Sequence, residues 1–338
     1  VQLGAMASRY DIDRRRLWKG TVLPATGGDA WFTSGSAAYW RILDGLPEAP
    51  DEGATELGLA LADEASRLLW TIAREGDLAP ADAEPALDRT APYVVSRVKG
   101  VFALHQLRLL LGDDAFLDAM AAVHERYRDR EATTAELIAD LEQTTGRSLD
   151  GFIRQWVDRE GLPALAPQVE VRSVRGGEWE VRLQQPDAGQ SWHLLTAVEV
   201  TAGGARHLEP VDLVGDRQVT LRFETRPERV VVNPLWDVPV DSERFAAWRN
   251  LLDDFHRIKV VYGTSRHVDF SRDMAVRFSE LLADTYTEIL PPVVSDAELD
   301  AEAIADADLV LLDVAGDNGA VAAIAGTLPA EFGRGWFR

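Results

Sequence analysis

Apolar side chains recur every three or four residues along much of the first half of the chain. Residues 57–69 and 101–111 both place leucine, valine or alanine at the spacing that lines one face of an amphipathic helix. Thr133 followed by Glu136 has the form of a capping box, and Gly146 is a plausible helix end. The pattern predicts a mostly helical domain over residues 1–165.

The hydrophobic period changes after residue 163. Between residues 168 and 240 apolar and polar residues alternate in short runs, as in Val169-Glu170-Val171. Glycine pairs at 176–177 and 203–204 separate the runs and supply turn chemistry. Short strands at this spacing predict a small β-sandwich over residues 166–245.

A third pattern begins near Ile258. Residues 258–263 and 309–313 read as buried parallel strands, and a helical stretch over 274–282 lies between them. This order predicts an α/β region over residues 255–338. The expected fold class is therefore multidomain α+β: a helical part, then a β-sandwich, then a βαβ region.

Composition and charge exclude several classes of function. The chain has 338 residues with 35 Lys and Arg against 56 Asp and Glu, giving a formal net charge of −21. An acidic protein lacks the basic face that nucleic acid or anionic lipid requires, so we expect neither partner. Nor is there an apolar run of the length that a membrane helix needs. The chain contains no cysteine, which removes disulfides, thiolate zinc sites and cysteine nucleophiles.

Several short motifs occur in a fixed order over about 150 residues. These are residues 29–39, which match W-L-x-E-G-x-A-x-Y, then Lys99-Gly100, residues 111–116, 146–149, 155–157 and 161–163. In this order they resemble the later part of the catalytic domain of the gluzincin zinc aminopeptidases, the family of alanyl aminopeptidase and the leukotriene hydrolases. The resemblance implies a thermolysin-like helical domain, often followed by a β-sandwich.

The resemblance also implies where a zinc site would lie. The family binds zinc with H-E-x-x-H on one helix and a glutamate on the next, and residues 18–24 resemble the segment that follows the first motif. Counting from there puts the two histidine positions at Ile12 and Arg16, the general-base glutamate at Asp13 and the third ligand at Ser34. Isoleucine cannot ligate zinc, and arginine is permanently cationic. We therefore expect no catalytic residue, metal ligand or zinc cofactor here, although zinc is the family's metal.

A further substitution falls on the family's proton-donating tyrosine, which aligns with Arg97. If the cleft survives, the resemblance and the charges together predict an anion- or peptide-binding cleft formed by Arg16, Ser34 and Arg97. His105 follows the Lys-Gly pair on the same predicted helix, and we interpret it as a hydrogen-bonded structural histidine.

Two other features of the sequence offer weaker sites. Residues 263–265 end a strand and could receive an anion at a helix N-terminus, although a plain strand-to-helix turn is the simpler interpretation. The acidic residues between 296 and 308 lack calcium-loop spacing and indicate a solvated surface.

The sequence leaves three hypotheses for function. The first is a degenerate, non-catalytic aminopeptidase-like protein that acts as a peptide- or anion-binding or assembly scaffold, with a peptide or protein partner. The second is a C-terminal fragment of an active zinc metallo-aminopeptidase whose catalytic residues lie outside this chain. The third is a small-molecule or nucleotide role for the C-terminal α/β region. The chain starts at Val1 without a signal-peptide pattern, so we interpret it as a fragment or mature piece and assign no compartment.

Overall fold

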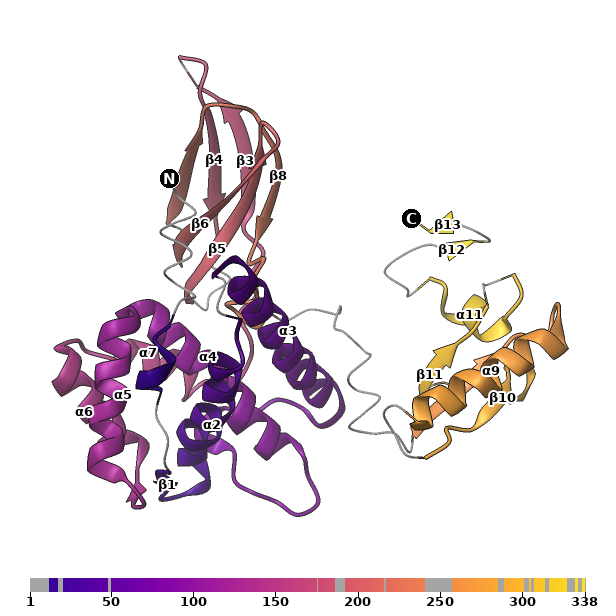
Figure 1. Ribbon diagram of the computed structural model, residues 1–338, viewed down its shortest axis with the longest axis horizontal. Helices are drawn as coiled ribbons and strands as arrows, with labels where there is room; N and C mark the ends of the chain where they lie inside the picture. The colour runs from indigo at the N-terminus through magenta and orange to yellow at the C-terminus, as the bar shows by residue number, and fades with distance from the viewer. Residues whose placement is uncertain are drawn as a thin grey trace. The chain divides into compact units, whose positions relative to one another are not determined.

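The computed structural model divides into two compact units, residues 1–243 and 244–338, and each is described by itself (Figure 1). The residues that it describes are 12–17, 21–47, 50–174, 176–185, 192–215, 217–240, 257–284, 289–300, 304, 307–313, 316–326, 332–333 and 336–337. Residues 18–20, on which the predicted zinc register depends, lie outside this set. None of the described helices is long and apolar enough to cross a membrane.

Helices make up the N-terminal part of the first unit. Its elements are η1 (Arg14–Arg16), β1 (Leu23–Pro24), η2 (Gly27–Asp29), α2 (Ala30–Asp44), α3 (Pro50–Glu75), η3 (Pro80–Asp82), α4 (Ala91–Leu111), α5 (Asp113–Tyr127), β2 (Glu131–Ala132), α6 (Thr134–Thr145) and α7 (Asp150–Trp156). The helical expectation is confirmed in detail at α6. Thr133 and Glu136 cap its start reciprocally, and Gly146 ends it in the left-handed conformation with φ 66°.

Helices α2 and α4 cross in direct backbone contact at two glycines. A Cβ atom on Gly100 would lie 2.2 Å from the Trp31 carbonyl oxygen, and one on Gly35 would lie 2.5 Å from the Gly100 carbonyl carbon. Neither position has room for a side chain. The crossing therefore fixes α2 and α4 against each other and holds the residues next to these glycines close together.

Six strands form two three-stranded antiparallel sheets in the same unit. They are β3 (Gln168–Ser173), β4 (Trp179–Gln184), β5 (His193–Ala202), β6 (Ala205–Val214), β7 (Gln218–Phe223) and β8 (Pro227–Val232), in the orders β3-β4-β7 and β6-β5-β8. Gly203 and Gly204 both have positive φ and close the β5–β6 hairpin with a two-residue turn, as that turn type requires.

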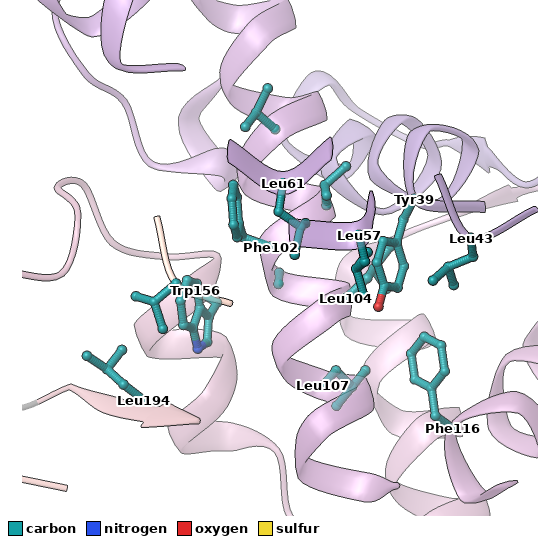
Figure 2. Close-up of a cluster of buried hydrophobic side chains, with 14 of the residues drawn as sticks. Tyr39, Leu43, Leu57, Leu61, Phe102, Leu104, Leu107, Phe116, Trp156 and Leu194 are labelled. Carbon is teal, nitrogen blue, oxygen red and sulfur yellow. The ribbon is translucent and has the colours of Figure 1, made fainter. Parts of the chain in front are cut away.

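One hydrophobic core runs through the helices and both sheets. Tyr39, Leu57, Phe102 and Leu107 of the helices are fully buried, and the same cluster continues to Leu194 of β5 (Figure 2). The helices predicted over residues 1–165 and the strands predicted over 166–245 therefore belong to one compact unit.

The second unit contains a small parallel sheet. Its elements are β9 (Ile258–Tyr262), α9 (Val268–Leu282), β10 (Val293–Ser295), η6 (Asp296–Glu298), β11 (Asp308–Leu311), α11 (Gly319–Ile324), β12 (Phe332–Gly333) and β13 (Trp336–Phe337). Strands β10 and β11 flank β9, and both run parallel to it. This is the strand–helix–strand order predicted from the sequence, and the multidomain α+β fold class is confirmed.

Candidate functional site

Helices α2 and α4 line a pocket of about 330 Å³ in the helical part. Helix α2 contributes one face to it, because its lining residues are spaced by whole turns, and α4 contributes its first two turns. The lining residues are Ala30, Ser34, Ala37, Arg41, Ala83, Pro85, Pro92, Tyr93, Ser96 and Arg97. We call this site the Ser34–Arg97 pocket.

The pocket brings together two of the three residues predicted to form a cleft. Ser34 comes directly before Gly35, and Arg97 lies three residues before Gly100. Since these two glycines are the crossing point of α2 and α4, the backbone holds Ser34 and Arg97 near each other. Tyr93 lines the same pocket one helical turn before Arg97 and is half exposed.

Arg97 has a carboxylate partner on a neighbouring helix. Its guanidinium forms a hydrogen-bonded ion pair with Glu64 of α3. The Glu64 side chain is only 6% exposed, whereas Arg97 is 34% exposed at the pocket wall. The positive charge of Arg97 is therefore compensated from within the protein.

Arg41 is a pocket residue that the sequence interpretation missed. Its Nε donates to the Ala37 carbonyl oxygen at 3.0 Å, and its side chain is exposed. No ion pair of Arg41 occurs within the part of the chain that the structure describes. Its spacing of seven residues from Ser34, two turns along one helix, was the signal that could have identified it.

Arg16, the third predicted cleft residue, does not line this pocket. Its guanidinium contacts two carboxylates of α5, Asp114 at 2.6 Å and Asp118 at 2.7 Å. The hydrogen bond to Asp114 is the main reason that the pKa of Arg16 is raised. The structure thus brings together Ser34 and Arg97 but ties Arg16 to another helix.

The residues at the predicted zinc positions do not fit a zinc ion. Ile12 is 5% exposed and belongs to the hydrophobic core. Asp13 caps η1 and holds Arg15 at 2.9 Å, and this hydrogen bond lowers the pKa of the Asp13 carboxyl. With Arg16 paired as above, Ser34 alone offers a weak oxygen donor. Within the described ranges, no group of three or more His, Asp or Glu side chains is placed to hold a metal.

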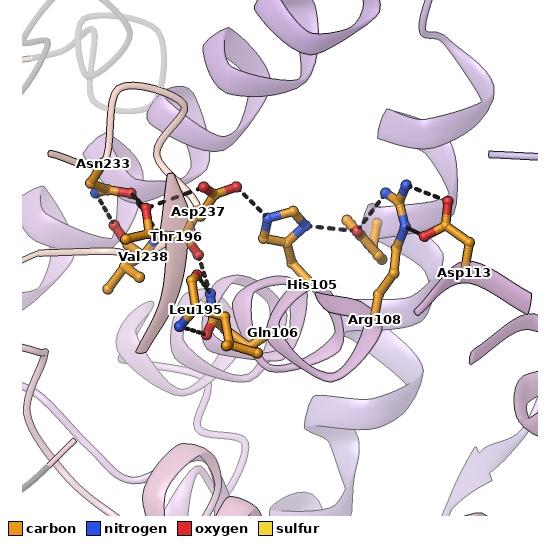
Figure 3. A network of polar contacts seen from close by, with 10 residues as sticks. His105, Gln106, Arg108, Asp113, Leu195, Thr196, Asn233, Asp237 and Val238 are labelled. Atoms are coloured by element: carbon orange, nitrogen blue, oxygen red, sulfur yellow. Dashed lines mark hydrogen bonds and ion pairs between the residues drawn. The ribbon is translucent and has the colours of Figure 1, made fainter. Parts of the chain in front are cut away.

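His105 does not line the Ser34–Arg97 pocket; it belongs to a buried chain of polar contacts (Figure 3). Its Nδ1 is 2.8 Å from the Tyr39 hydroxyl and its Nε2 is 3.0 Å from Asp237, and both ring and carboxylate are fully buried. Burial raises the pKa of Tyr39, against the effect of the neighbouring Arg108 guanidinium. The structural role predicted for His105 agrees with these contacts.

The next residue on α4 joins the helix to the sheets. The Gln106 side chain donates to the carbonyl oxygens of Leu195 and Asp237, each at 2.8 Å, and accepts from the Leu195 N–H at 3.0 Å. Together with His105 it fixes α4 against β5 and the segment after β8.

In the second unit, the turn after β9 (residues 263–265) is packed against other parts of the protein. A Cβ on Gly263 would lie 2.1 Å from the Asp317 carbonyl oxygen, so the loops after β9 and β11 touch. Asp296, one of the acidic run, accepts from the Thr264 hydroxyl and from the Gly319 N–H, both at 2.6 Å. These contacts give the turn and Asp296 a role in holding the fold together.

No family model matches the chain. Aminopeptidase N of Streptomyces lividans is 29% identical to it over 76 residues, which cover 22% of this chain and 9% of that protein. Aminopeptidase N of Lactococcus lactis subsp. lactis is 25% identical over 132 residues, which cover 38% of this chain and 14% of that protein. The matches therefore span a small part of each relative's length.

Two solved structures align with part of this chain. Aminopeptidase A of Legionella pneumophila in complex with aspartic acid aligns with 86% of this chain and 32% of its own chain, at 14% identity and a TM-score of 0.46. An M1 zinc metallopeptidase of Deinococcus radiodurans bound to a Tyr-Ser-Ala substrate aligns with 45% of this chain and 34% of its own, at 23% identity and a TM-score of 0.33. Taken with the shared motifs, the sequence matches support a distant relationship of this chain to the gluzincin zinc aminopeptidases.

Proposed function

We propose that this chain is a non-hydrolytic relative of the zinc aminopeptidases that binds an anionic or peptide group in the Ser34–Arg97 pocket. The observation that carries the proposal is that Ser34 and Arg97 line one pocket. In the family resemblance these positions belong to a zinc ligand and to a proton donor. Here they offer a hydroxyl and a guanidinium, which can bind an anion but cannot hold zinc or supply a proton at neutral pH.

The surroundings of Arg97 support the same proposal. A carboxylate as buried as that of Glu64 is costly without a counter-charge, and Arg97 supplies that counter-charge from α4. The ion pair with Glu64 therefore holds the Arg97 guanidinium at the wall of the pocket.

Metal analysis and a peptidase assay on the purified chain test the proposal. We expect less than stoichiometric zinc by elemental analysis and no release of aniline from aminoacyl anilides, with or without added zinc. An active zinc aminopeptidase assayed in parallel shows that the conditions detect turnover. Stoichiometric zinc together with turnover by this chain would overturn the proposal.

A second candidate is that the chain belongs to an active zinc aminopeptidase whose catalytic residues lie outside it. The observation that favours it is the small share of each relative that the matches cover. If a longer natural form containing this chain hydrolysed aminoacyl anilides with zinc while the chain alone did not, the second candidate would replace the first.

A further inference from the structure

We infer that Arg41 is the main anion-binding side chain of the Ser34–Arg97 pocket, and that the pocket takes a single carboxylate carried by a small apolar group. The inference rests on the proposed function, because it names the ligand class of the same pocket. It assigns the central role to a residue outside the predicted cleft.

Elimination among the arginines is the first step. Arg16 holds Asp114 and Asp118 and does not line the pocket. Arg97 lines it, but its charge is matched by Glu64. Arg41 is the other charged residue of the lining.

The second step is the geometry of Arg41. Its Nε is engaged by the Ala37 carbonyl oxygen of the preceding helical turn, which orients the guanidinium along α2. The two terminal nitrogens then point away from that bond, and a guanidinium can bind both oxygens of one carboxylate through two parallel hydrogen bonds. The hydroxyl of Ser34 lies two helical turns before Arg41 on the same helix and is an additional donor in the same pocket.

Charge balance limits the ligand. The two guanidinium groups of the lining and the Glu64 carboxylate leave one net positive charge at the pocket wall. A monoanion neutralises that charge, whereas a phosphate dianion would leave one negative charge uncompensated. The balance therefore favours a carboxylate.

The rest of the lining limits the size and polarity of the ligand. Half of the lining residues are alanine or proline, namely Ala30, Ala37, Ala83, Pro85 and Pro92. Ligand pockets span about 300 to 1,000 Å³, so a pocket of 330 Å³ is at the small end. A carboxylate next to one apolar side chain matches this space, and the end of a peptide and a free acylated amino acid share that chemistry.

Binding of N-acetyl-leucine to the full chain, measured by titration calorimetry, tests the ligand class. N-acetyl-leucinamide has the same shape and no charge, so we expect it to bind roughly 10- to 100-fold more weakly, the factor that a charge-assisted hydrogen bond is worth. Equal affinity for the acid and the amide would overturn the inference. The peptide acetyl-Ala-Ala-Leu distinguishes the two sources, because tighter binding than N-acetyl-leucine indicates a peptide end.

A pair of matched variants tests the role of Arg41. Arg41→Gln removes the charge at an exposed position, and we expect it to weaken binding of N-acetyl-leucine by roughly 10-fold or more while binding of the amide is unchanged. Arg217→Gln makes the same change at an exposed arginine between β6 and β7, outside the lining, and should bind as the wild type does. If Arg41→Gln bound the acid as tightly as Arg217→Gln, the assignment would be wrong.

The two proposals fail in different ways. Zinc-dependent turnover would remove the proposed function and leave the binding comparison of acid with amide to be judged by itself. Absence of any binding of the acid to a chain that also lacks turnover would remove the carboxylate inference alone.

Discussion

Gly100 has room for no atom beyond its hydrogens. A Cβ there would lie 2.2 Å from the Trp31 carbonyl oxygen, in the backbone of the neighbouring helix. We expect Gly100→Ala to lower the free energy of unfolding by about 1–3 kcal/mol, the usual cost of overpacking, in urea titrations followed by circular dichroism. Gly151 of α7 has nothing within 4 Å of its Cβ position, so Gly151→Ala should keep or raise stability. Equal losses in both variants would contradict this account of the crossing.

The hydroxyl of Tyr39 joins two buried groups. It lies 2.8 Å from His105 Nδ1 and accepts from Arg108 at 3.3 Å. Tyr39→Phe leaves these groups short of a partner in a dry region, and we expect a loss of about 1–3 kcal/mol in the free energy of unfolding. Tyr93→Phe alters a half-exposed hydroxyl and should change stability by less than about 0.5 kcal/mol. A loss confined to Tyr93→Phe would show that the buried chain is not stabilising.

Asp29 links η2 and α2 to the start of α6. Its carboxylate accepts from the Thr134 N–H at 2.7 Å and from the Thr26 hydroxyl at 2.7 Å. Burial alone would raise the pKa of Asp29, but these hydrogen bonds outweigh it and hold the pKa below its ordinary value of 3.8. The stabilisation is therefore complete above that ordinary value and is lost as the pH falls through the lower folded pKa.

A comparison of the wild type with Asp29→Asn at two pH values tests this dependence. We expect the difference in free energy of unfolding to be larger at pH 7 than at pH 3, because below 3.8 the carboxyl of the unfolded chain takes up a proton and the advantage of the ionised folded form decreases. The same difference at both pH values would exclude the carboxylate charge as its cause.

At the scale of elements, the cap of α6 is formed by two residues that lie three apart in the sequence. The Thr133 hydroxyl accepts from the Glu136 N–H at 3.3 Å, and the Glu136 carboxylate accepts from the Thr133 N–H at 2.9 Å. We expect Thr133→Ala to lower the free energy of unfolding by about 1 kcal/mol, with Thr133→Ser close to the wild type because it keeps the oxygen. A serine variant as unstable as the alanine variant would point to lost methyl packing.

Elements that carry local signals were predictable from the sequence. The cap of α6 and the parallel strand β9 follow from residues next to each other in the chain. Strand β6 was not predicted, because none of its first six residues is buried and it contains Pro210, so its pattern carries little alternation. It forms because the glycine turn at 203–204 folds it back along β5.

In the candidate site, too, the features with a local sequence signal were predictable and those set by distant contacts were not. Ser34 and Arg97 were identified by motif, and the glycines beside them place both in one pocket. Arg16 was expected with them, but its partner Asp114 is 98 residues away in sequence. Local spacing carries no information on such a contact, and the same is true of the pairing of Arg97 with Glu64.

At the scale of the whole molecule, the helices and sheets of the first unit share a hydrophobic core and are joined by polar side-chain contacts. Gln106 and His105 of α4 bond to Leu195 and Asp237 of the sheet region. We expect peptides from α4 and β5 to lose hydrogen-exchange protection at the same urea concentration, and Asp237→Asn to lower both midpoints together. If β5 lost protection well before α4, the two parts would be separate folding units.

The contact between Gly35 and Gly100 separates what shapes the pocket from what gives it chemistry. Two residues without side chains set the distance between α2 and α4, and the side chains at 34, 41 and 97 line the space that results. A library randomised at positions 34 and 41, with Arg97 kept as the partner of Glu64, would therefore retain its scaffold while sampling new specificities. The helix crossing therefore provides a fixed backbone framework on which binding sites could be engineered.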